Sequence, residues 1–407
     1  MTTSRLFLLP IKWIVVAAIG FWFLSVAYAT ITIEDRVFSD GRLVSDASGD
    51  GSLLPFAGLF LALAGAIIGF RHRQYIFSII KRNTAFTLIG AVFLVMLLTN
   101  VFYFHIASLA YIGLFIVSIL TTLYANKVFG GKLFIVFAIA VSATLVLFVA
   151  VHGAPTGRWI GGIHPNHIGA FALLAAFLAA QSGHSFRWII YLIAIFFTIL
   201  VSSRYAMIAI AMIVVADYLA SMSRFDLRRA IGLVILSAMF FLAILFGHEV
   251  IAHWLALHDS ARGIESGFTG RAEMWNRFAP QILERPFVGF GFRQRDLYYG
   301  THNGFLDFAL ENGVIVATLF FFAILSIIRE GVVKLRKCDK GKRNIIITAA
   351  SWFAWAFSGF FQPQLVNFGD AFGIMTMFLL TAHVKWMTSN EMSKWQVEHS
   401  PRNDAYA

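Results

Sequence analysis

Apolar runs of about 20 residues recur along the whole chain, with short polar or basic segments between them. Each run is long enough to cross a bilayer as an α-helix, which satisfies its own backbone hydrogen bonds. The runs lack the alternation of apolar and polar residues that membrane barrel strands have. The pattern predicts an all-α integral membrane protein with about twelve transmembrane helices. The predicted spans are 11–32, 53–70, 84–103, 106–125, 133–151, 164–182, 186–201, 205–221, 230–247, 304–328, 345–361 and 365–386.

The spacing of the spans divides the chain into four parts. Nine transmembrane helices are expected within 1–247, and three more within 304–388. Between these groups, 248–303 is the one long segment outside the membrane, and 389–407 is a cytoplasmic tail.

Composition agrees with a membrane protein. The 407 residues are 59% hydrophobic and only 13% charged, and a soluble domain of this length has no core large enough to bury so much apolar surface. The single cysteine, Cys338, excludes an internal disulfide and a site with several cysteine ligands. No Asp-x-Asp sequence occurs, so a metal-bound nucleotide sugar is not indicated, and no cofactor is expected.

The basic residues predict the orientation of the chain. With both termini cytoplasmic, 22 of the 32 Lys and Arg residues lie on the inner side, as the positive-inside rule expects. Ala27-Tyr28-Ala29 also fits a signal-peptidase site, and that alternative starts the chain inside as well. The net charge of +11 mostly reflects this bias, so we expect contact with membrane lipid and no binding of nucleic acid.

All ten basic residues predicted to lie outside are arginines. Arginine presents a planar fork that suits bidentate contact with phosphate, whereas lysine presents a point charge. The alternative explanation is that lysine simply follows the positive-inside rule more strictly. The ten are Arg36, Arg42, Arg158, Arg204, Arg262, Arg271, Arg277, Arg285, Arg293 and Arg295.

Two of these arginines lie close to predicted helix ends. Arg204 ends the three-residue turn that begins at Ser202, and a charge so near hydrocarbon is a functional candidate unless it extends to the headgroups. Arg158 precedes the sixth span, which opens with His164-Pro165-Asn166-His167. The two histidines have the spacing of metal ligands, but no third ligand is near, so we expect no zinc site.

The outer segment contains a predicted amphipathic helix. Trp275, Phe278, Ala279 and Ile282 fall at helical spacing, which predicts a short helix on the membrane surface. Arg271 lies in its first turn, where the helix dipole disfavours a cation unless an anion binds there. A helix N-terminus together with an arginine makes a strong anion site.

His302 and Asn303 stand directly before the tenth predicted span. A histidine at a helix start tends to stay neutral, as a general base requires, although a lone histidine at the interface is more often structural. Asp307 and Glu311 follow on one face of the same helix. This set suits an anionic, lipid-linked substrate: arginines would stabilise a departing phosphate while the histidine accepts the proton of an attacking hydroxyl.

Several of these segments resemble one family. The run 301–313 is similar to the His-Asn-x9-Gly signature of the O-antigen ligase and O-antigen polymerase superfamily, with His302, Asn303 and Gly313 at the defining positions. Further motifs similar to that family are Gly270-Arg271 with Trp275, Arg285 to Gly291, Ser203-Arg204, and Arg158 with Gly161 and Pro165-Asn166.

The resemblance implies a C-type glycosyltransferase-like fold and a metal-independent reaction in the bacterial inner membrane, with a periplasmic active site. The donor would be a glycan linked to undecaprenyl pyrophosphate, and the acceptor would be lipid A–core or a second carrier-linked glycan. His302 would activate the acceptor hydroxyl, and Arg204, Arg271 and Arg158 would bind the pyrophosphate. The positions expected to support them are Asn303, Asp307, Glu311 and Asn166.

Three alternatives remain at this point. The ligase pattern often has a small or polar residue where this chain has Val316, which leaves ligase and polymerase both open. A transporter of lipid-linked glycans is a second possibility, but the two halves of the chain do not repeat each other. A polyprenyl-phosphate sugar transferase could use the paired acids Glu34-Asp35, which are more simply part of a solvated acidic loop.

Overall fold

The computed structural model describes residues 4–31, 38–39, 42–43, 54–153, 160, 165–221, 271–292, 301, 303–337, 342–361, 365–366 and 371–398. The helices in these ranges are α1 (Ser4–Ile31), α2 (Leu54–Arg71), α3 (Arg73–Arg82), α4 (Thr84–Phe102), α5 (Ile106–Phe129), α6 (Gly131–His152), α7 (Pro165–Ser182), α8 (Arg187–Leu200), α9 (Arg204–Ala220), α11 (Arg271–Phe278), the 3-10 helix η1 (Ala279–Leu283), α12 (Gly304–Lys337), α13 (Lys342–Gly359) and α14 (Ala371–Glu398). Two short strands, β1 (Phe38–Ser39) and β2 (Arg42–Leu43), pair antiparallel.

The predicted spans coincide with helices throughout the described residues, and only the span 230–247 lies outside them. Several helices extend beyond their predicted spans: α1 begins at Ser4, α12 continues to Lys337 and α14 continues to Glu398. The short amphipathic helix α3 was not predicted. Four helical segments are long and apolar enough to cross a membrane, namely Thr84–Phe102, Ser108–Phe129, Gly131–His152 and Gly304–Arg336.

Helix α7 lies at the centre of the bundle. It packs against α6, α8, α9 and α14, and every residue from Ile168 to Gln181 is buried. The helix is rich in alanine, which has the highest helix propensity and lets neighbouring backbones approach closely. Pro165 occupies the first helical position, where its missing N–H removes no hydrogen bond.

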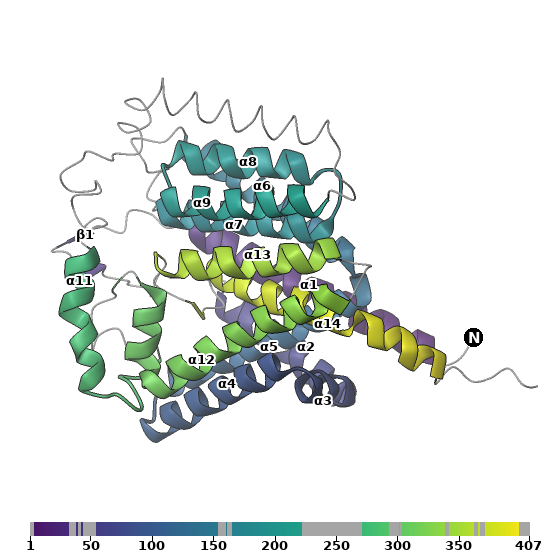
Figure 1. The fold of residues 1–407 in the computed structure, drawn as a ribbon, viewed down its shortest axis with the longest axis horizontal. Helices are drawn as coiled ribbons and strands as arrows, with labels where there is room; N and C mark the ends of the chain where they lie inside the picture. The colour runs from purple at the N-terminus through teal and green to yellow at the C-terminus, as the bar shows by residue number, and fades with distance from the viewer. Residues whose placement is uncertain are drawn as a thin grey trace, which may run out of the picture.

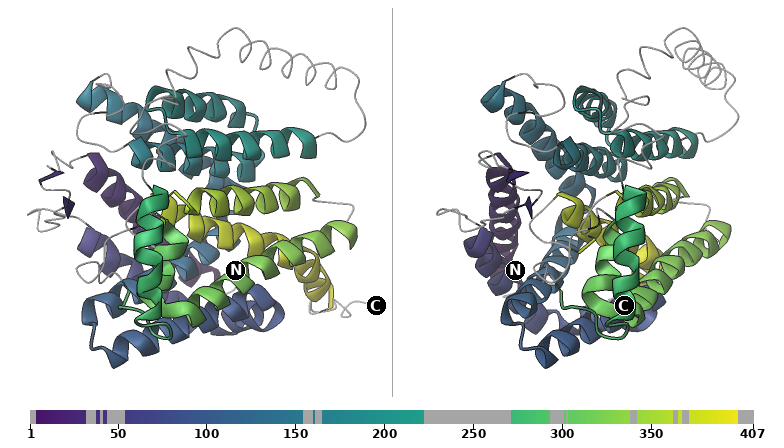
Figure 2. Two further views of the ribbon diagram at one scale, coloured as in Figure 1. Left: turned by 60° about the vertical axis from the view of Figure 1, so that its left-hand side comes forward. Right: turned by 90° about the vertical axis from the view of Figure 1, so that its left-hand side faces the viewer.

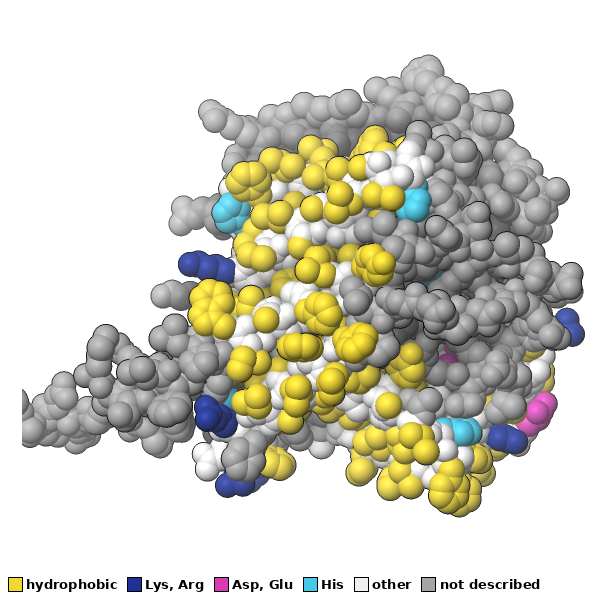
Figure 3. Space-filling view, turned by 180° about the vertical axis from the view of Figure 1, so that it is seen from behind, with side chains coloured by type: hydrophobic (Ala, Val, Ile, Leu, Met, Phe, Trp, Pro, Cys, Tyr) yellow, Lys and Arg dark blue, Asp and Glu magenta, His cyan; other side chains and the backbone are white. Residues whose placement is uncertain are grey.

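The outer surface of the bundle is apolar, as a lipid-facing surface must be. Large side chains such as Leu94, Val136, Leu192 and Phe321 are more than half exposed. Figure 3 shows hydrophobic side chains across one face, with most of the visible Lys and Arg along its edges. The serines and threonines within the helices mostly donate to a carbonyl one turn back, which satisfies them without water; examples are Ser118, Thr121, Thr122, Ser142 and Thr144.

The helices run between two ends of the bundle that differ in chemistry. We call the end that holds α11 and the start of α12 the loop end, at the left of Figure 1. The opposite end, where α9 ends after Asp217, is the ion-pair end. The views of Figure 2 place α11 across the loop end. Among the described helices, the end of α4 and the starts of α7 and α9, all predicted to face outside, lie at the loop end. The end of α9 and the start of α13, predicted to face inside, lie at the ion-pair end. This arrangement of helix ends agrees with the predicted topology. Which side of the membrane each end faces stays a prediction.

The ion-pair end is closed by side chains from several helices. The buried carboxylate of Asp217 in α9 contacts Arg187 Nε of α8 (2.8 Å) and Arg343 Nη2 of α13 (2.5 Å). It also accepts a hydrogen bond from the Tyr191 hydroxyl (2.8 Å). One carboxylate therefore joins three helices that surround the end of α7.

A second polar cluster closes the same end between α4, α12 and α14. His383 Nε2 lies 2.9 Å from Glu330 Oε2 and 3.3 Å from Asn83 Nδ2. The other carboxylate oxygen of Glu330 accepts from the N–H of Ala85 (3.2 Å), and the Asn83 side chain caps α4 at Phe86 N (3.1 Å). Both clusters are structural contacts between helix ends.

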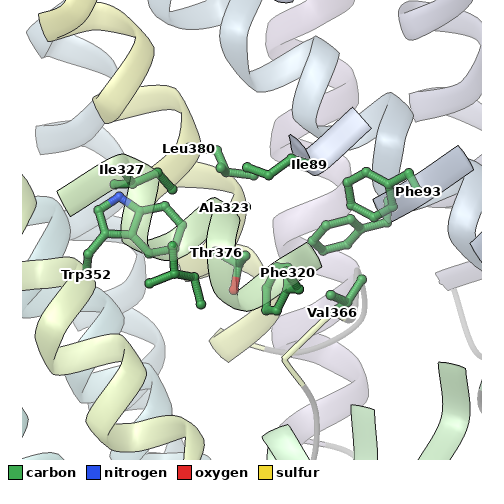
Figure 4. A pocket seen from close by; sticks show the side chains of 11 residues that line it. Ile89, Phe93, Phe320, Ala323, Ile327, Trp352, Val366, Thr376 and Leu380 are labelled. Carbon is green, nitrogen blue, oxygen red and sulfur yellow. The ribbon is translucent and has the colours of Figure 1, made fainter. Parts of the chain in front are cut away.

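The close-up in Figure 4 shows a small cavity between α4, α12, α13 and α14. Its lining includes Phe93, Phe320, Trp352 and Leu380, and none of the lining residues is titratable. We interpret this space as a gap in the apolar core, since it is lined mostly by apolar side chains and the Thr376 hydroxyl is hydrogen-bonded within the protein.

Candidate functional site

Arg204 is held at the start of a helix by a tight turn. Helix α8 ends at Leu200, and α9 begins at Arg204 itself. Between them, Ser202 takes a left-handed backbone conformation (φ 50°), and Ser203 N–H donates to the Thr198 carbonyl (2.9 Å). The short turn predicted from the sequence is confirmed, and the partly buried Arg204 stands at the loop end of the bundle.

Tyr205 ties the start of α9 to the start of α7. Its hydroxyl donates to the backbone carbonyl of Asn166 at 2.6 Å. Ser203 packs so close to Gly169 that a Cβ at this glycine would lie 2.3 Å from the Ser203 oxygen. Two predicted site residues, Arg204 and Asn166, therefore lie at neighbouring helix starts.

Aromatic side chains extend this contact to the start of α12. The ring of Tyr205 stacks on Phe361, just beyond the end of α13, with centroids 6.3 Å apart. The adjacent Phe360 lies 5.0 Å from the ring of Phe305 in the first turn of α12. Gly359 permits this approach, since a Cβ there would lie 2.8 Å from the Phe305 ring. The starts of α7, α9 and α12 thus meet at one end of the molecule.

The start of α12 is fixed by a dense set of hydrogen bonds. The Asn303 side chain accepts from the N–H groups of Phe305 (3.1 Å) and Leu306 (3.2 Å), which makes it the N-cap of the helix. Asp307 Oδ1 accepts from both the N–H (2.8 Å) and the hydroxyl (2.7 Å) of Thr301. Asp307 is 1% exposed, so its carboxylate serves the protein backbone rather than solvent.

Helix α11 is joined to the same segment. Trp275 Nε1 donates to the Thr301 carbonyl at 3.0 Å. Arg271 is the first residue of α11, one turn before Trp275 and therefore on the same face of the helix. The amphipathic helix predicted here is confirmed for 271–278, although the chain continues as a 3-10 helix through 279–283.

Gly313 breaks α12 into two parts. Its backbone has φ 80° and ψ 168°, which no helical residue adopts, and Figure 1 shows the two parts meeting at a sharp angle. The break makes room for the segment 286–292: Phe290 N–H donates to the Leu310 carbonyl (2.8 Å), and Val314 N–H donates to the Pro286 carbonyl (2.7 Å). The predicted span 304–328 is helical, but its helix is broken at Gly313, which the sequence did not predict.

The segment 286–292 crosses α12 at this break, and we call the contact the glycine crossing. It is possible only because each of the two segments has a glycine there. A Cβ at Gly313 would lie 2.5 Å from the Phe287 backbone, and a Cβ at Gly289 would lie 2.5 Å from the Glu311 backbone. Both glycines have positive φ. This close contact explains why the last residue of the His-Asn-x9-Gly pattern is a glycine.

The segment after Gly289 is anchored to the α4–α5 turn. Phe292 N–H donates to Asn100 Oδ1 (3.1 Å), and its carbonyl accepts from the Ser108 hydroxyl (2.5 Å). The Arg285 guanidinium lies over the Phe290 ring, 5.1 Å from its centroid. These contacts hold 285–292 against both α12 and the α4–α5 turn.

The structure describes the side chains of five of the eight predicted site residues. His302 and Arg158 lie outside the described residues, and Arg271 is placed only by its backbone. Arg204, Asn166, Asn303, Asp307 and Glu311 all lie at the loop end, the last three buried. Within the described ranges, no group of three His, Cys, Asp or Glu residues could hold a metal ion.

Sequence reasoning missed the residues that join these positions. Tyr205 and Phe361 belong to no quoted motif, and Thr301 was quoted only as the residue before His302, so only their contacts reveal their roles. Trp275 was assigned to the apolar face of a surface helix, while its indole N–H makes a specific bond to the segment before α12. The sequence did offer one signal for this contact: the indole N–H of Trp275 is a hydrogen-bond donor on an otherwise apolar helix face.

These observations define an all-α, multi-pass membrane protein with a polar site built from helix starts at one end. Residues 189–321 match the family model described as O-antigen ligase. The resemblance to the O-antigen ligase and polymerase superfamily is therefore confirmed in the part of the chain that carries Arg204, Arg271, His302 and Gly313, and it supports glycan transfer of that general type. No curated protein matches the chain.

Proposed function

We propose that this protein transfers a glycan from undecaprenyl pyrophosphate to an acceptor hydroxyl at the periplasmic face of the bacterial inner membrane, as an O-antigen ligase does. The observation that carries the proposal is the family match over residues 189–321, because it contains the candidate base and two candidate pyrophosphate-binding arginines. Lipid A–core is the proposed acceptor. The fold is proposed to be C-type glycosyltransferase-like, with about twelve transmembrane helices and one long periplasmic loop over 248–303.

The proposed reaction exchanges one C–O bond for another. The acceptor hydroxyl oxygen attacks the anomeric carbon of the glycan, and the bond from that carbon to the pyrophosphate oxygen breaks. Undecaprenyl pyrophosphate leaves with the electron pair, and neutral His302 takes the hydroxyl proton as general base. The positive end of the helix that follows His302 favours the neutral form before the reaction.

The positions of the arginines support their proposed role. Arg204 and Arg271 are the first residues of α9 and α11, where backbone N–H groups and the helix dipole already favour an anion. A guanidinium at each position adds bidentate contact with the pyrophosphate, and Arg158 is proposed as a further contact. These groups would neutralise the leaving charge without a metal ion.

Polymerisation is the second candidate. In that reaction the acceptor is another glycan on undecaprenyl pyrophosphate, and the chemistry at the anomeric carbon is the same. The observation in its favour is Val316, which is buried in α12 where the ligase pattern often has a small or polar residue.

The fate of carrier-linked glycan in cells that lack the protein tests the proposal. A ligase predicts long glycans accumulating on undecaprenyl pyrophosphate while lipid A–core stays bare. A polymerase predicts single repeat units on the carrier and no long chains. Carrier-linked glycan of normal length and amount, with a normally decorated acceptor, would contradict both candidates.

A further inference from the structure

The backbone on both sides of residue 302 is fixed by one connected set of hydrogen bonds. Thr301 uses all of its polar groups: its N–H and hydroxyl donate to Asp307 Oδ1 (2.8 and 2.7 Å), and its carbonyl accepts from Trp275 Nε1 (3.0 Å). Asn303 N–H donates to the Thr301 hydroxyl oxygen (3.2 Å), and its carbonyl accepts from Asp307 N–H (2.8 Å). Thr301 is fully buried and Asn303 nearly so.

This arrangement exceeds what a helix start needs. Asn303 alone caps α12 through its side chain. Asp307 reaches back past the cap to Thr301, six residues earlier. Burial of this polar side chain costs free energy, which its two hydrogen bonds to Thr301 partly offset. The extra bonds restrain the residue before 302, which no capping function requires.

The same set connects two separate elements. Trp275 belongs to α11, whose first residue is Arg271, and it bonds to the residue that precedes 302. The indole therefore links the helix that starts with a candidate pyrophosphate arginine to the segment that carries the candidate base. A shift of α11 would move the Thr301 carbonyl with it.

We propose that Trp275, Thr301 and Asp307 are positioning residues that hold residue 302 in register with α11, so that base and leaving group are aligned. The proposal rests on the proposed function, in which His302 is the general base. A base displaced by about 1 Å loses much of its effect, so these residues act on turnover more than on substrate affinity.

Kinetics of matched variants test this proposal. Each purified variant is returned to membranes of cells that lack the protein, and release of undecaprenyl pyrophosphate from the accumulated carrier-linked glycan is measured. We expect Thr301→Val and Trp275→Phe to lower kcat roughly 10-fold to 100-fold while KM for the carrier-linked glycan changes less than about twofold. Thr301→Ser retains the hydroxyl and should recover most of the wild-type kcat.

The ion-pair end provides matched controls. Thr348→Val removes a buried threonine hydroxyl that bonds to Asn344, and Trp386→Phe removes an indole N–H that faces Gln181. Both should keep wild-type kcat per folded molecule. A merely structural role for Thr301 would lower the folded amount of Thr301→Val and leave kcat per folded molecule unchanged, which would overturn the proposal.

The results also separate this proposal from the proposed function. If His302→Ala is inactive while Thr301→Val and Trp275→Phe keep wild-type kcat, the positioning network is refuted and the proposed function stands. If His302→Ala retains wild-type transfer, the general base itself is wrong, and positioning of residue 302 fails with it. Should Thr301→Val not fold, Trp275→Phe decides the question alone.

Discussion

The two ends of the bundle both place arginines in the first turn of helices, but they use them differently. At the ion-pair end, Arg187 and Arg343 lie in the first turns of α8 and α13, and both contact the buried carboxylate of Asp217. At the loop end, Arg204 and Arg271 start α9 and α11, and we propose that the pyrophosphate of the substrate supplies the anion. A cation at a helix start is disfavoured by the dipole, so each placement gains from an anion.

At the ion-pair end, charged side chains maintain the fold, and at the loop end we propose that the arginines bind the substrate. Asp217 joins three helices, and the Glu330 cluster joins three others. The loop end is instead fixed mainly by backbone bonds: helix caps, the glycine crossing and the Thr301 bonds. The predictions below test this division.

The largest effect is expected from removing Asp217. Asp217→Ala leaves two guanidinium groups at a largely buried position without their common partner, so we expect the unfolding free energy to fall by about 3–5 kcal/mol. Thermal unfolding in detergent measures this loss. The triple variant that also carries Arg187→Met and Arg343→Met should recover part of it, because no unpaired buried charge remains. An Asp217→Ala protein as stable as wild type would contradict a structural role for this end.

The arginines at the loop end should affect transfer instead. Arg204→Lys and Arg271→Ala are each expected to lower glycan transfer by about 100-fold or more, because a bidentate contact to the leaving group is lost. Transfer per folded molecule in reconstituted membranes is the measurement. Arg187→Lys is the matched control, since it changes the same residue type at the same helix position, and it should lower stability but not turnover. Wild-type transfer by Arg204→Lys would indicate that this side chain only reaches the headgroups.

The glycine crossing offers a third test. Gly313→Ala forces a Cβ against the Phe287 backbone and a left-handed conformation on alanine, so we expect a loss of about 2 kcal/mol or more in stability. Transfer should fall as well, because 286–292 can no longer pack against α12. Gly90→Ala is the control, because a Cβ added at Gly90, within α4, would have no other atom within 4 Å. Equal stability of the two variants would mean that the crossing is not required.

The smallest effect concerns pH and the ion-pair end. Burial, with the nearby charges of Lys127 and Arg71, lowers the pKa of His72 below its usual value of 6.5. The folded state therefore favours neutral His72, and its stability falls as the pH drops below about 6.5, where the unfolded chain takes up the proton. The His72→Phe variant keeps a ring against Tyr124 and should lose less thermal stability than wild type between pH 7.5 and pH 5.5. An equal loss in both proteins would contradict this.

The helices could be predicted from the sequence because a span depends only on local composition. Runs of apolar residues identified the positions of α4 to α9 within a few residues. The break at Gly313 could not be predicted, since a glycine within an apolar run is compatible with a continuous helix. Only the backbone of 286–292, brought there by tertiary packing, explains why the helix stops.

The candidate site was only partly predictable for the same reason. Charged residues at helix starts, such as Arg204 and Asp307, are visible in a single sequence because charge near hydrocarbon is unusual. The contacts that connect these residues are not visible in the sequence. Tyr205 bonds to Asn166, 39 residues away, and Trp275 bonds to Thr301, 26 residues away. At the ion-pair end, Asp217 meets Arg343 across 126 residues.

The most direct test of the central claim is a reconstituted transfer assay on the wild-type protein and His302→Ala. Membranes of cells that lack the protein supply the carrier-linked glycan and the acceptor, and excess chelator is present throughout. Our account predicts that wild-type protein releases one undecaprenyl pyrophosphate for each new glycosidic bond, and that His302→Ala lowers the rate about 100-fold to 10,000-fold while folding normally. Wild-type rates in His302→Ala, or no transfer by the wild-type protein once metal is chelated, would contradict the account.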